Sequence, residues 1–300
     1  MKIKNIESLS EEYYKSSDFK DLREKTKVDY KCCMNIMLNT KVDKYKLCQV
    51  RVKNMTGARA RKAYEIWLER GVQSANHICA VSRKLYSFAM EHGYAETNPF
   101  STFKKKTAKS RKILWTREQL QKFLDVAYSQ FEYRNIGLIV QMAYELCQRV
   151  GDMRTLTFDC IDFENNILHL EQSKRGAEVH LPIEPQLMLM LKQQKKDYDF
   201  QKYVVPYPKA RNGKYKPYLM CSLSIIARRI LNMANLPKEL RISDLRRTGT
   251  TELVESGVPM AQIMSVTGHA SPQSVQPYIK NTYTSAKNAL TARKNYGKNI

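Results

Sequence analysis

The residues with the clearest chemical potential lie near the C-terminal end of the chain, where arginine, histidine and tyrosine follow one another. Arg246 and Arg247 form a pair, and Tyr278 comes nine residues after His269. A guanidinium is a planar fork that matches phosphate oxygens, an imidazole can donate a hydrogen bond, and a phenol is a nucleophile. These residue types could therefore surround and attack a phosphodiester.

Two helices are expected to hold these side chains. The first spans Ser243–Glu255, or starts one residue later, and stops at Gly257. The second starts at Val258-Pro259, because proline is favoured in a first turn, and ends at Gly268-His269. The arginine pair then lies at the beginning of one helix, and the histidine directly follows the other.

This stretch resembles the C-terminal signature of the tyrosine recombinase (phage integrase) family. The matching residues are Asp244-Leu245-Arg246-Arg247-Thr248, Gly257, Gly268-His269 and a tyrosine at the family's distance from that histidine. Two earlier segments resemble further landmarks of the family. RVGDMRTLTFDCID resembles the first arginine box and begins with Arg149, and QSKRGAEVHLPI resembles the hairpin of the catalytic lysine, which maps to Lys174. The resemblance covers roughly residues 15–283 and is more specific in the second half.

The resemblance implies a role for each of these residues. Arg149 and Arg246 would hold the two non-bridging phosphate oxygens, and His269 would donate to the same oxygens. Lys174 would protonate the leaving 5′-oxygen while Tyr278 attacks the phosphorus. A free phenol has a pKa of about 10, so only about one in 10³ is ionised at pH 7, and the arginines would offset that cost. The implied product is a 3′-phosphotyrosine with a free 5′-hydroxyl, and we expect no metal and no cofactor.

Two positions depart from the family pattern. Ser243 stands where the second box usually has a histidine, and a hydroxyl cannot accept a proton at neutral pH as imidazole can. The acceptor of the Tyr278 proton is therefore left open between water and Asp244, and we expect Ser243 to slow cleavage rather than abolish it. The other departure is Cys147-Gln148, directly before the first arginine box, where a glycine is common; we interpret it as a packing detail.

The 300-residue chain has a formal net charge of +22. Residues 1–112 carry 25 basic and 12 acidic side chains (net +13), and residues 113–300 carry 26 and 17 (net +9). Such an excess in both parts indicates a polyanion gripped from both sides, with nucleic acid the first candidate and an acidic membrane the second. There is no apolar run of roughly 18 residues and no signal peptide, so we expect no membrane partner and a cytoplasmic location, at the nucleoid or in a phage-infected host cell. The seven scattered cysteines form no Cys-x-x-Cys pair, which argues against zinc and for a reduced compartment.

The expected fold is mainly α with a small antiparallel β-sheet (α+β), in two domains. Residues 1–103 would form a helical core-binding domain that binds DNA, and the run SANHICAVSRKLYSFAMEHGYAETNPF within it resembles that domain of the family. Its expected helices are Lys27–Leu38 with Cys32, Cys33, Ile36 and Met37 inward, Arg59–Arg70 with Tyr64, Trp67 and Leu68 inward, and Ser74–Gly93 with Ser74 as N-cap. Residues 104–115 would be a basic interdomain linker, for which nuclear localisation is the alternative interpretation.

Residues 116–284 would form the catalytic domain, followed by a helix-prone tail, 285–300, that could dock onto a neighbouring protomer. The expected elements are a capping box at Thr116 opening a helix to about Ser129, an apolar helix Ile136–Leu146, a loop over LTFDCIDFENN, strands Ile167–Gln172 and Ala177–Ile183, a helix over 184–196 and a basic loop over 203–218. The two strands make a hairpin with Lys174 at or near its tip.

The side chains expected to contact DNA lie on one helix, on the linker and on the 203–218 loop. They are Arg83, Lys84, Lys104, Lys105, Lys106, Lys109, Arg111, Lys112, Lys209, Arg211, Lys214 and Lys216. The resemblance implies that the partner is double-stranded DNA clamped by both domains. It also implies a homo-tetramer on two recombination sites, exchanging strands in pairs through a Holliday junction, and accessory DNA-bending proteins could assist.

Two other functions stay open. A type IB topoisomerase would use the same chemistry without bringing two sites together. A non-catalytic DNA-binding protein could have kept the fold, and Ser243 is the one feature in its favour. Tyr283, close to Tyr278, is a rival nucleophile.

Overall fold

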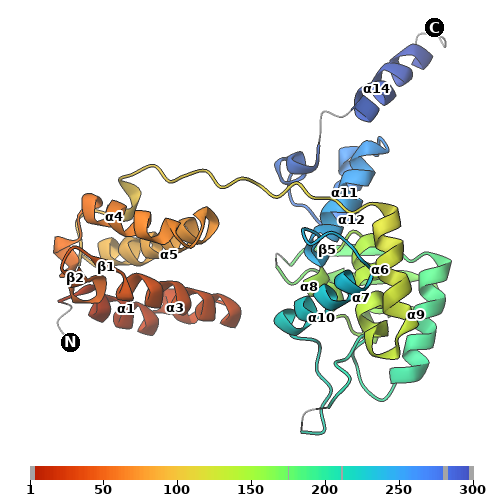
Figure 1. Ribbon diagram of the computed structural model, residues 1–300, viewed down its shortest axis with the longest axis horizontal. Coiled ribbons are helices and arrows are strands. Elements are labelled where there is room, and N and C mark those ends of the chain that lie inside the picture. The colour runs from red at the N-terminus through yellow and green to blue at the C-terminus, as the bar shows by residue number, and fades with distance from the viewer. Residues whose placement is uncertain (1–3, 175, 211, 280–282, 297–300) are drawn as a thin grey trace. The chain divides into compact units, whose positions relative to one another are not determined.

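The computed structural model describes residues 4–174, 176–210, 212–279 and 283–296 (Figure 1). Its contacts divide the chain into two compact units, Met1–Arg111 and Lys112–Ile300, and each is described by itself. Within the described ranges, no helix combines the length and the apolar character that crossing a membrane would require.

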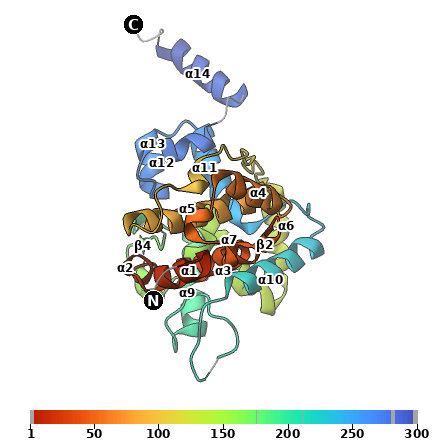
Figure 2. The same ribbon diagram turned by 90° about the vertical axis from the view of Figure 1, so that its left-hand side faces the viewer.

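The N-terminal unit is a helical bundle in which α1 and α3 form one layer and α4 and α5 another (Figures 1 and 2). Its elements are α1 (Ile6–Lys15), α2 (Ser17–Lys20), α3 (Glu24–Asn39), β1 (Lys41–Val42), β2 (Tyr45–Lys46), α4 (Gly57–Leu68) and α5 (Val72–Glu91). α5 packs against α1, α3 and α4. The expected inward positions Tyr64 and Trp67 of α4 are confirmed, since both side chains are almost completely buried. The small antiparallel pair β1–β2 was not expected.

The start of α5 differs from the expectation. Its N-cap is Gly71, so Ser74 lies inside the helix and does not cap it. Gly71 and Gly93 flank the helix with φ of 94° and 71°. Glycine, which has no Cβ, adopts a positive φ at little cost, so a glycine in this conformation lies at each end of the helix.

The inward face of α3 also needs one correction. Cys32 is exposed, whereas Cys33, Met34 and Met37 are buried. Successive helical residues turn by about 100°, so the stripe that contains residues 33, 34 and 37 leaves Cys32 beside it. Ile36 is only partly buried against this core.

The C-terminal unit is built around α7 (Arg134–Glu145), which is buried on most of its faces. Its other helices are α6 (Arg117–Ser129), α8 (Val150–Met153), α9 (Pro185–Tyr198), α10 (Met220–Met233), α11 (Leu245–Glu255), α12 (Met260–Thr267), α13 (Pro272–Val275) and α14 (Tyr283–Tyr296). α6, α10 and α11 pack against α7. The predicted capping box is confirmed, because Thr116 and Gln119 each accept a hydrogen bond from the other's backbone N–H.

One antiparallel sheet in this unit has the strand order β3-β4-β5. β4 (Ile167–Glu171) and β5 (Glu178–Pro182) form the predicted hairpin, with Leu168 opposite Leu181. β3 (Ile161–Asp162) pairs with β4 in a stretch that was expected to be a loop. The predicted fold class is confirmed, since the chain is mainly helical with small antiparallel sheets.

Residues 104–116 lie in neither helix nor strand. Their first part is tied to the N-terminal unit, because Lys106 N donates to Tyr64 Oη at 2.9 Å. Their last part is tied to the C-terminal unit through Trp115, whose backbone N–H donates to Thr248 Oγ1 and whose indole donates to Arg241 O, both at 3.0 Å. The two hydrogen bonds of Trp115 hold the beginning of the C-terminal unit against the start of α11.

Candidate active site

Arg149 lies at the N-cap of α8, where the chain turns after α7. Its Nη1 donates to Gln172 Oε1 at 2.6 Å and lies 3.7 Å from Asp152 Oδ2. Cys147 has a φ of 52°, the left-handed region in which glycine is favoured. The departure from glycine at this position is therefore a matter of backbone strain as well as packing, and the turn directs Arg149 towards the hairpin.

Arg246 lies in the first turn of α11 and is only 7% exposed. Its Nη2 donates to Thr267 O, and its Nη1 lies 3.3 Å from the acceptor Gln148 Oε1. Burial and the positive charge of Arg149 lower the pKa of Arg246 to about 10, and Tyr278 partly opposes that change. The guanidinium is therefore still charged at neutral pH, in a place where a bound anion would stabilise it.

His269 follows α12 through Gly268, whose φ is 64°. The Thr267 hydroxyl donates to Ile263 O at 2.7 Å, and the same Oγ1 lies 2.6 Å from His269 Nδ1. A hydroxyl has a single proton, so when that proton lies on the bond to Ile263 O, Nδ1 is the donor to Thr267. In the neutral form of the ring, the lone pair is then on Nε2.

Tyr278 ends a 3₁₀ turn, Gln276–Tyr278, that packs against α11. The turn is anchored by Val275, which is completely buried. The ring of Tyr278 lies 5.6 Å from the His269 ring between centroids, and the Arg247 guanidinium lies 5.4 Å from the Tyr278 centroid. Arg149, Arg246, His269 and Tyr278 thus converge from four separate stretches of the C-terminal unit.

Lys174 and Ser243 are placed differently. Lys174 is exposed in the turn between β4 and β5, and within the described part of the chain it has no hydrogen bond or ion pair. The residue before it, Ser173, donates to Asp152 through both its backbone N–H and its hydroxyl, which fixes the base of that turn. Ser243 is exposed and lines a cavity of about 420 Å³ that also includes Val150, next to the first arginine.

Residues 114–285 match the phage integrase family over more than half of the chain. The chain belongs to the phage integrase family. Similar solved structures include a lambda integrase dimer bound to a COC′ core site, with 19% identity over 91% of this chain and 77% of that chain and a TM-score of 0.73. Another is the Tn1549 transposon integrase with a circular intermediate DNA, with 16% identity over 96% and 99% and a TM-score of 0.75. A third is a lambda integrase tetramer bound to a Holliday junction, with 18% identity over 91% and 77% and a TM-score of 0.74. No curated protein matches the chain.

Several residues around the family landmarks were not singled out as site residues from the sequence. Gln148 and Gln172 are completely buried and Asp152 is 3% exposed, although all three are polar. Arg247, noted only as half of an arginine pair, lies over the ring of Tyr278. The available sequence signal was position, since Gln148 directly precedes the first arginine and Gln172 lies two residues before Lys174.

The side chains expected to contact DNA differ in how exposed they are. Lys104, Lys106, Lys109, Lys112, Lys209, Lys214 and Lys216 are exposed, Lys105 and Arg111 are half-buried, and Arg211 lies outside the described residues. Arg83 is half-buried, and its Nη2 lies 3.4 Å from the acceptor Phe100 O. Lys84 pairs with Asp18 at 3.5 Å. These last two therefore have partners within the N-terminal unit.

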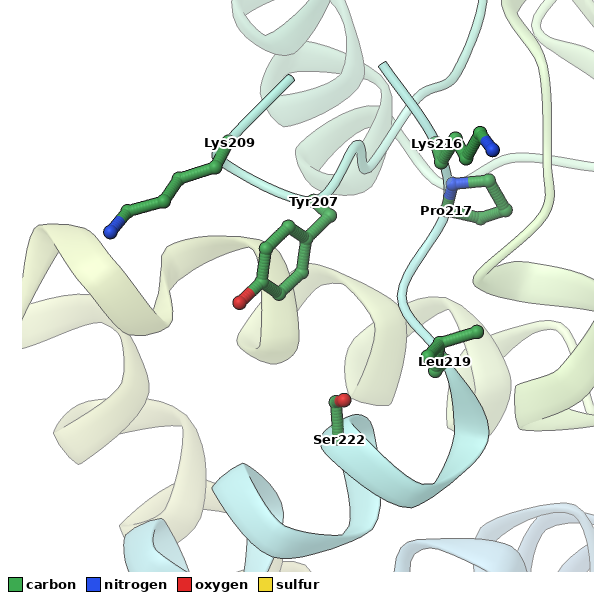
Figure 3. Close-up of a pocket in the computed structure, with 6 residues that line it drawn as sticks. All are labelled: Tyr207, Lys209, Lys216, Pro217, Leu219 and Ser222. Atoms are coloured by element: carbon green, nitrogen blue, oxygen red, sulfur yellow. The ribbon is translucent and has the colours of Figure 1, made fainter. Parts of the chain in front are cut away.

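The basic loop before α10 borders a small cavity of about 60 Å³ (Figure 3). Tyr207 from the loop and Ser222 from α10 face this cavity, while Lys209 and Lys216 extend from the loop in different directions. A metal ion could be held by another group of described residues, Asp29, Cys33 and His77, but these belong to the N-terminal unit and not to the tyrosine cluster.

Proposed function

We propose that this chain is a site-specific DNA recombinase that cleaves and rejoins DNA through a 3′-phosphotyrosine intermediate. The observation that carries the proposal is the convergence of Arg149, Arg246, His269 and Tyr278 within one unit. Two guanidiniums beside a phenol form a site for a phosphodiester anion, and membership of the phage integrase family makes DNA the source of that phosphodiester.

In this proposal Tyr278 Oη attacks the scissile phosphorus, and the bond from phosphorus to the 5′-oxygen breaks. Arg149 and Arg246 stabilise the charge on the two non-bridging oxygens as the pentacoordinate transition state forms. Lys174, from the exposed turn, gives a proton to the leaving oxygen. The phosphotyrosine ester conserves the bond energy, so a 5′-hydroxyl from a second strand can attack it and release Tyr278.

His269 is a suitable acceptor for the phenolic proton. Its Nδ1 donates to Thr267, so the neutral ring has its basic lone pair on Nε2. The ring lies beside that of Tyr278, with 5.6 Å between centroids. A histidine in the usual position is then not required, and Ser243 can be tolerated there. After accepting the proton, the imidazolium can donate to a phosphate oxygen.

The proposed substrate is double-stranded DNA, bound by both units. The proposed location of the protein is therefore the cytoplasm, with the cell's DNA. The exposed lysines of residues 104–112 and 209–216 would contact the phosphate backbone. We expect the active complex to be a homo-tetramer on two sites that exchanges strands through a Holliday junction. α14, whose described side chains are exposed, is the candidate segment for docking onto a neighbouring protomer.

A nicked suicide DNA substrate tests the chemistry on a denaturing gel. The wild-type protein should form a covalent protein–DNA adduct, Tyr278→Phe should form none, and the matched control Tyr283→Phe should still form it. A wild-type protein that binds the DNA without forming the adduct would support the non-catalytic alternative and contradict the proposal.

A second assay separates recombination from topoisomerase activity. A recombinase should join two separate sites and produce exchanged DNA ends. Relaxation of supercoiled DNA without any exchange product would favour the type IB topoisomerase instead.

A further inference from the structure

Two buried glutamines connect the arginines of the proposed active site. Arg149 Nη1 donates to Gln172 Oε1 at 2.6 Å, and Gln172 Nε2 donates to Gln148 Oε1 at 2.7 Å. The same Gln148 oxygen accepts from Arg246 Nη1 at 3.3 Å. Both glutamine side chains have 0% exposure. The two guanidiniums are therefore joined by a continuous path of hydrogen bonds through two fully buried amides.

The orientation of each amide is fixed by backbone carbonyl groups. Gln148 Nε2 donates to Leu146 O at 2.8 Å and to Val266 O at 2.7 Å. Gln172 Nε2 donates to Thr267 O at 2.9 Å as well as to Gln148. Carbonyl oxygens only accept, so each NH₂ group must face them and each amide oxygen must face an arginine. The amides cannot be flipped without leaving buried groups unpaired.

The same path includes the turn that carries His269. Val266 O and Thr267 O belong to the end of α12, and Arg246 Nη2 also donates to Thr267 O. A Cβ placed on Gly268 would lie 2.7 Å from Gln172 Nε2, so the amide packs directly against this glycine. A shift of either amide would therefore move the arginines and the histidine together.

The neutrality of these acceptors is the feature that matters most for chemistry. A carboxylate would hold a guanidinium more strongly, but it would also cancel the charge that a phosphate needs. Arg246 donates to an amide oxygen of Gln148 and to the backbone carbonyl of Thr267. The nearby carboxylate, Asp152, accepts from Ser173 through Oδ1, and its Oδ2 forms an ion pair with Arg149 Nη1 at 3.7 Å without a hydrogen bond.

We propose that Gln148 and Gln172 are positioning residues that hold Arg149 and Arg246 by hydrogen bonds to uncharged oxygens, so that no hydrogen-bonded carboxylate offsets the positive charge that the two guanidiniums present to the scissile phosphate. This inference rests on the proposed function of the site. It predicts that the charge of the acceptor matters more than its ability to accept a hydrogen bond.

The test compares Gln172→Met with Gln172→Glu in single-turnover adduct formation at saturating DNA. Both variants lose the amide N–H donors, whereas only glutamate keeps an acceptor for Arg149 and adds a negative charge. We expect Gln172→Met to be about 10-fold slower than wild type and Gln172→Glu slower by on the order of 10²–10³. If the glutamate variant were as fast as the methionine variant or faster, any acceptor would suffice and the inference would be wrong.

A neutral substrate provides a readout that a purely structural defect would not change. When a methylphosphonate replaces the scissile phosphate, the substrate has no negative charge for the glutamate to oppose. The ratio of the Gln172→Met rate to the Gln172→Glu rate should then fall towards one. A ratio that stayed as large as with the phosphate substrate would contradict a charge effect.

Gln194→Glu is the matched control, because Gln194 is a 3% exposed glutamine of the same unit, with Nε2 donating to Asn135 Oδ1 and Val204 O at 2.8 Å. It should lower the melting temperature and leave the adduct rate at saturating DNA unchanged. If Gln194→Glu lost as much of the adduct rate as Gln172→Glu, both losses would be due to misfolding, and the inference would be wrong.

A binding measurement separates failure of this inference from failure of the proposed function. If wild type forms no adduct, inorganic sulfate still probes the two arginines through its effect on the melting temperature. Wild type should gain more than Gln172→Met, and Gln172→Glu should gain least. Equal gains in all three proteins would overturn the inference whatever reaction the site performs.

Discussion

The two units differ in what they bury. Among the described residues, the polar side chains buried in the N-terminal unit are small hydroxyls: Ser10, Thr40 and Ser82. The C-terminal unit also buries amides, carboxylates and a guanidinium: Asn135, Gln141, Gln148, Asp152, Gln172, Gln194, Asp244 and Arg246. The first unit is thus an apolar and aromatic core, whereas the second has a polar network inside its core.

This difference separates residues that stabilise a fold from residues that a reaction requires. Burying a polar group is unfavourable unless it is hydrogen-bonded, and burying a charge is more so. Arg246 illustrates this, because its lowered pKa means that the folded state disfavours its charged form at every pH below about 10. A unit needed only as a scaffold has no reason to keep such groups. Gln148, Asp152, Gln172 and Arg246 lie in the proposed site, where a phosphate would need them, whereas Gln194 and Asn135 bond to each other elsewhere in the unit.

The largest expected effect comes from Arg246→Met. Removing the guanidinium should slow adduct formation by on the order of 10²–10³, because one preorganised donor to the transition state is lost. Stability should change little, since the unfavourable burial of charge disappears together with the bonds to Thr267 O and Gln148 Oε1. Single-turnover cleavage and urea denaturation measure the two quantities. A large loss of stability would instead make Arg246 a structural residue and remove the contrast between the units.

A pair of glycines gives the next largest effect. Gly257 and Gly268 have φ of 82° and 64°, but no atom lies within 4 Å of a Cβ on Gly257, whereas Gln172 Nε2 lies 2.7 Å from one on Gly268. Gly257→Ala should therefore cost about 1–2 kcal/mol of backbone strain and leave cleavage unchanged. Gly268→Ala should share that strain and also slow cleavage by about 10²-fold, because Gln172 and the arginines are displaced.

Adduct rates at saturating DNA and melting temperatures distinguish these two outcomes. Equal adduct rates for the two alanine variants would show that the polar network tolerates displacement of Gln172. The difference between the two units would then depend on buried charge alone.

The smallest effect on activity is expected in the N-terminal unit. Thr40→Val removes the acceptor of the Trp67 indole N–H, which lies 2.7 Å from Thr40 Oγ1. Leaving that buried donor unpaired should cost about 1–3 kcal/mol of stability. The adduct rate at saturating DNA should stay at the wild-type value. A slower chemical step, rather than a weaker fold, would mean that the N-terminal core also shapes the active site.

Much of the fold could be predicted because its signals are local. The capping box at Thr116 and the alternation of the β4–β5 hairpin depend only on neighbouring residues, and both are confirmed. Ser74 failed as an N-cap because Gly71 already provides a left-handed start for α5. Cys32 failed as a core residue because a small change in the phase of a helix moves one side chain out of its buried stripe.

The site was predictable to the extent that family landmarks mark it. The positions of Arg149, Arg246, His269 and Tyr278 follow from sequence motifs, and their roles stay a proposal. Burial of the two glutamines could not be predicted, because it results from the packing of α12 against β5 and the turn after α7. A polar residue in a loop is normally exposed, so only tertiary structure distinguishes these amides from surface residues.

The most direct test is to identify the residue that becomes bonded to DNA. Wild-type protein trapped on a nicked substrate can be digested with protease and nuclease, and the peptide that carries a nucleotide can be sequenced by mass spectrometry. We predict a 3′-phosphotyrosyl nucleotide on Tyr278, and none when Tyr278 is replaced by phenylalanine. A nucleotide on Tyr283 or on any other residue would contradict the account of a nucleophile surrounded by Arg149, Arg246 and His269.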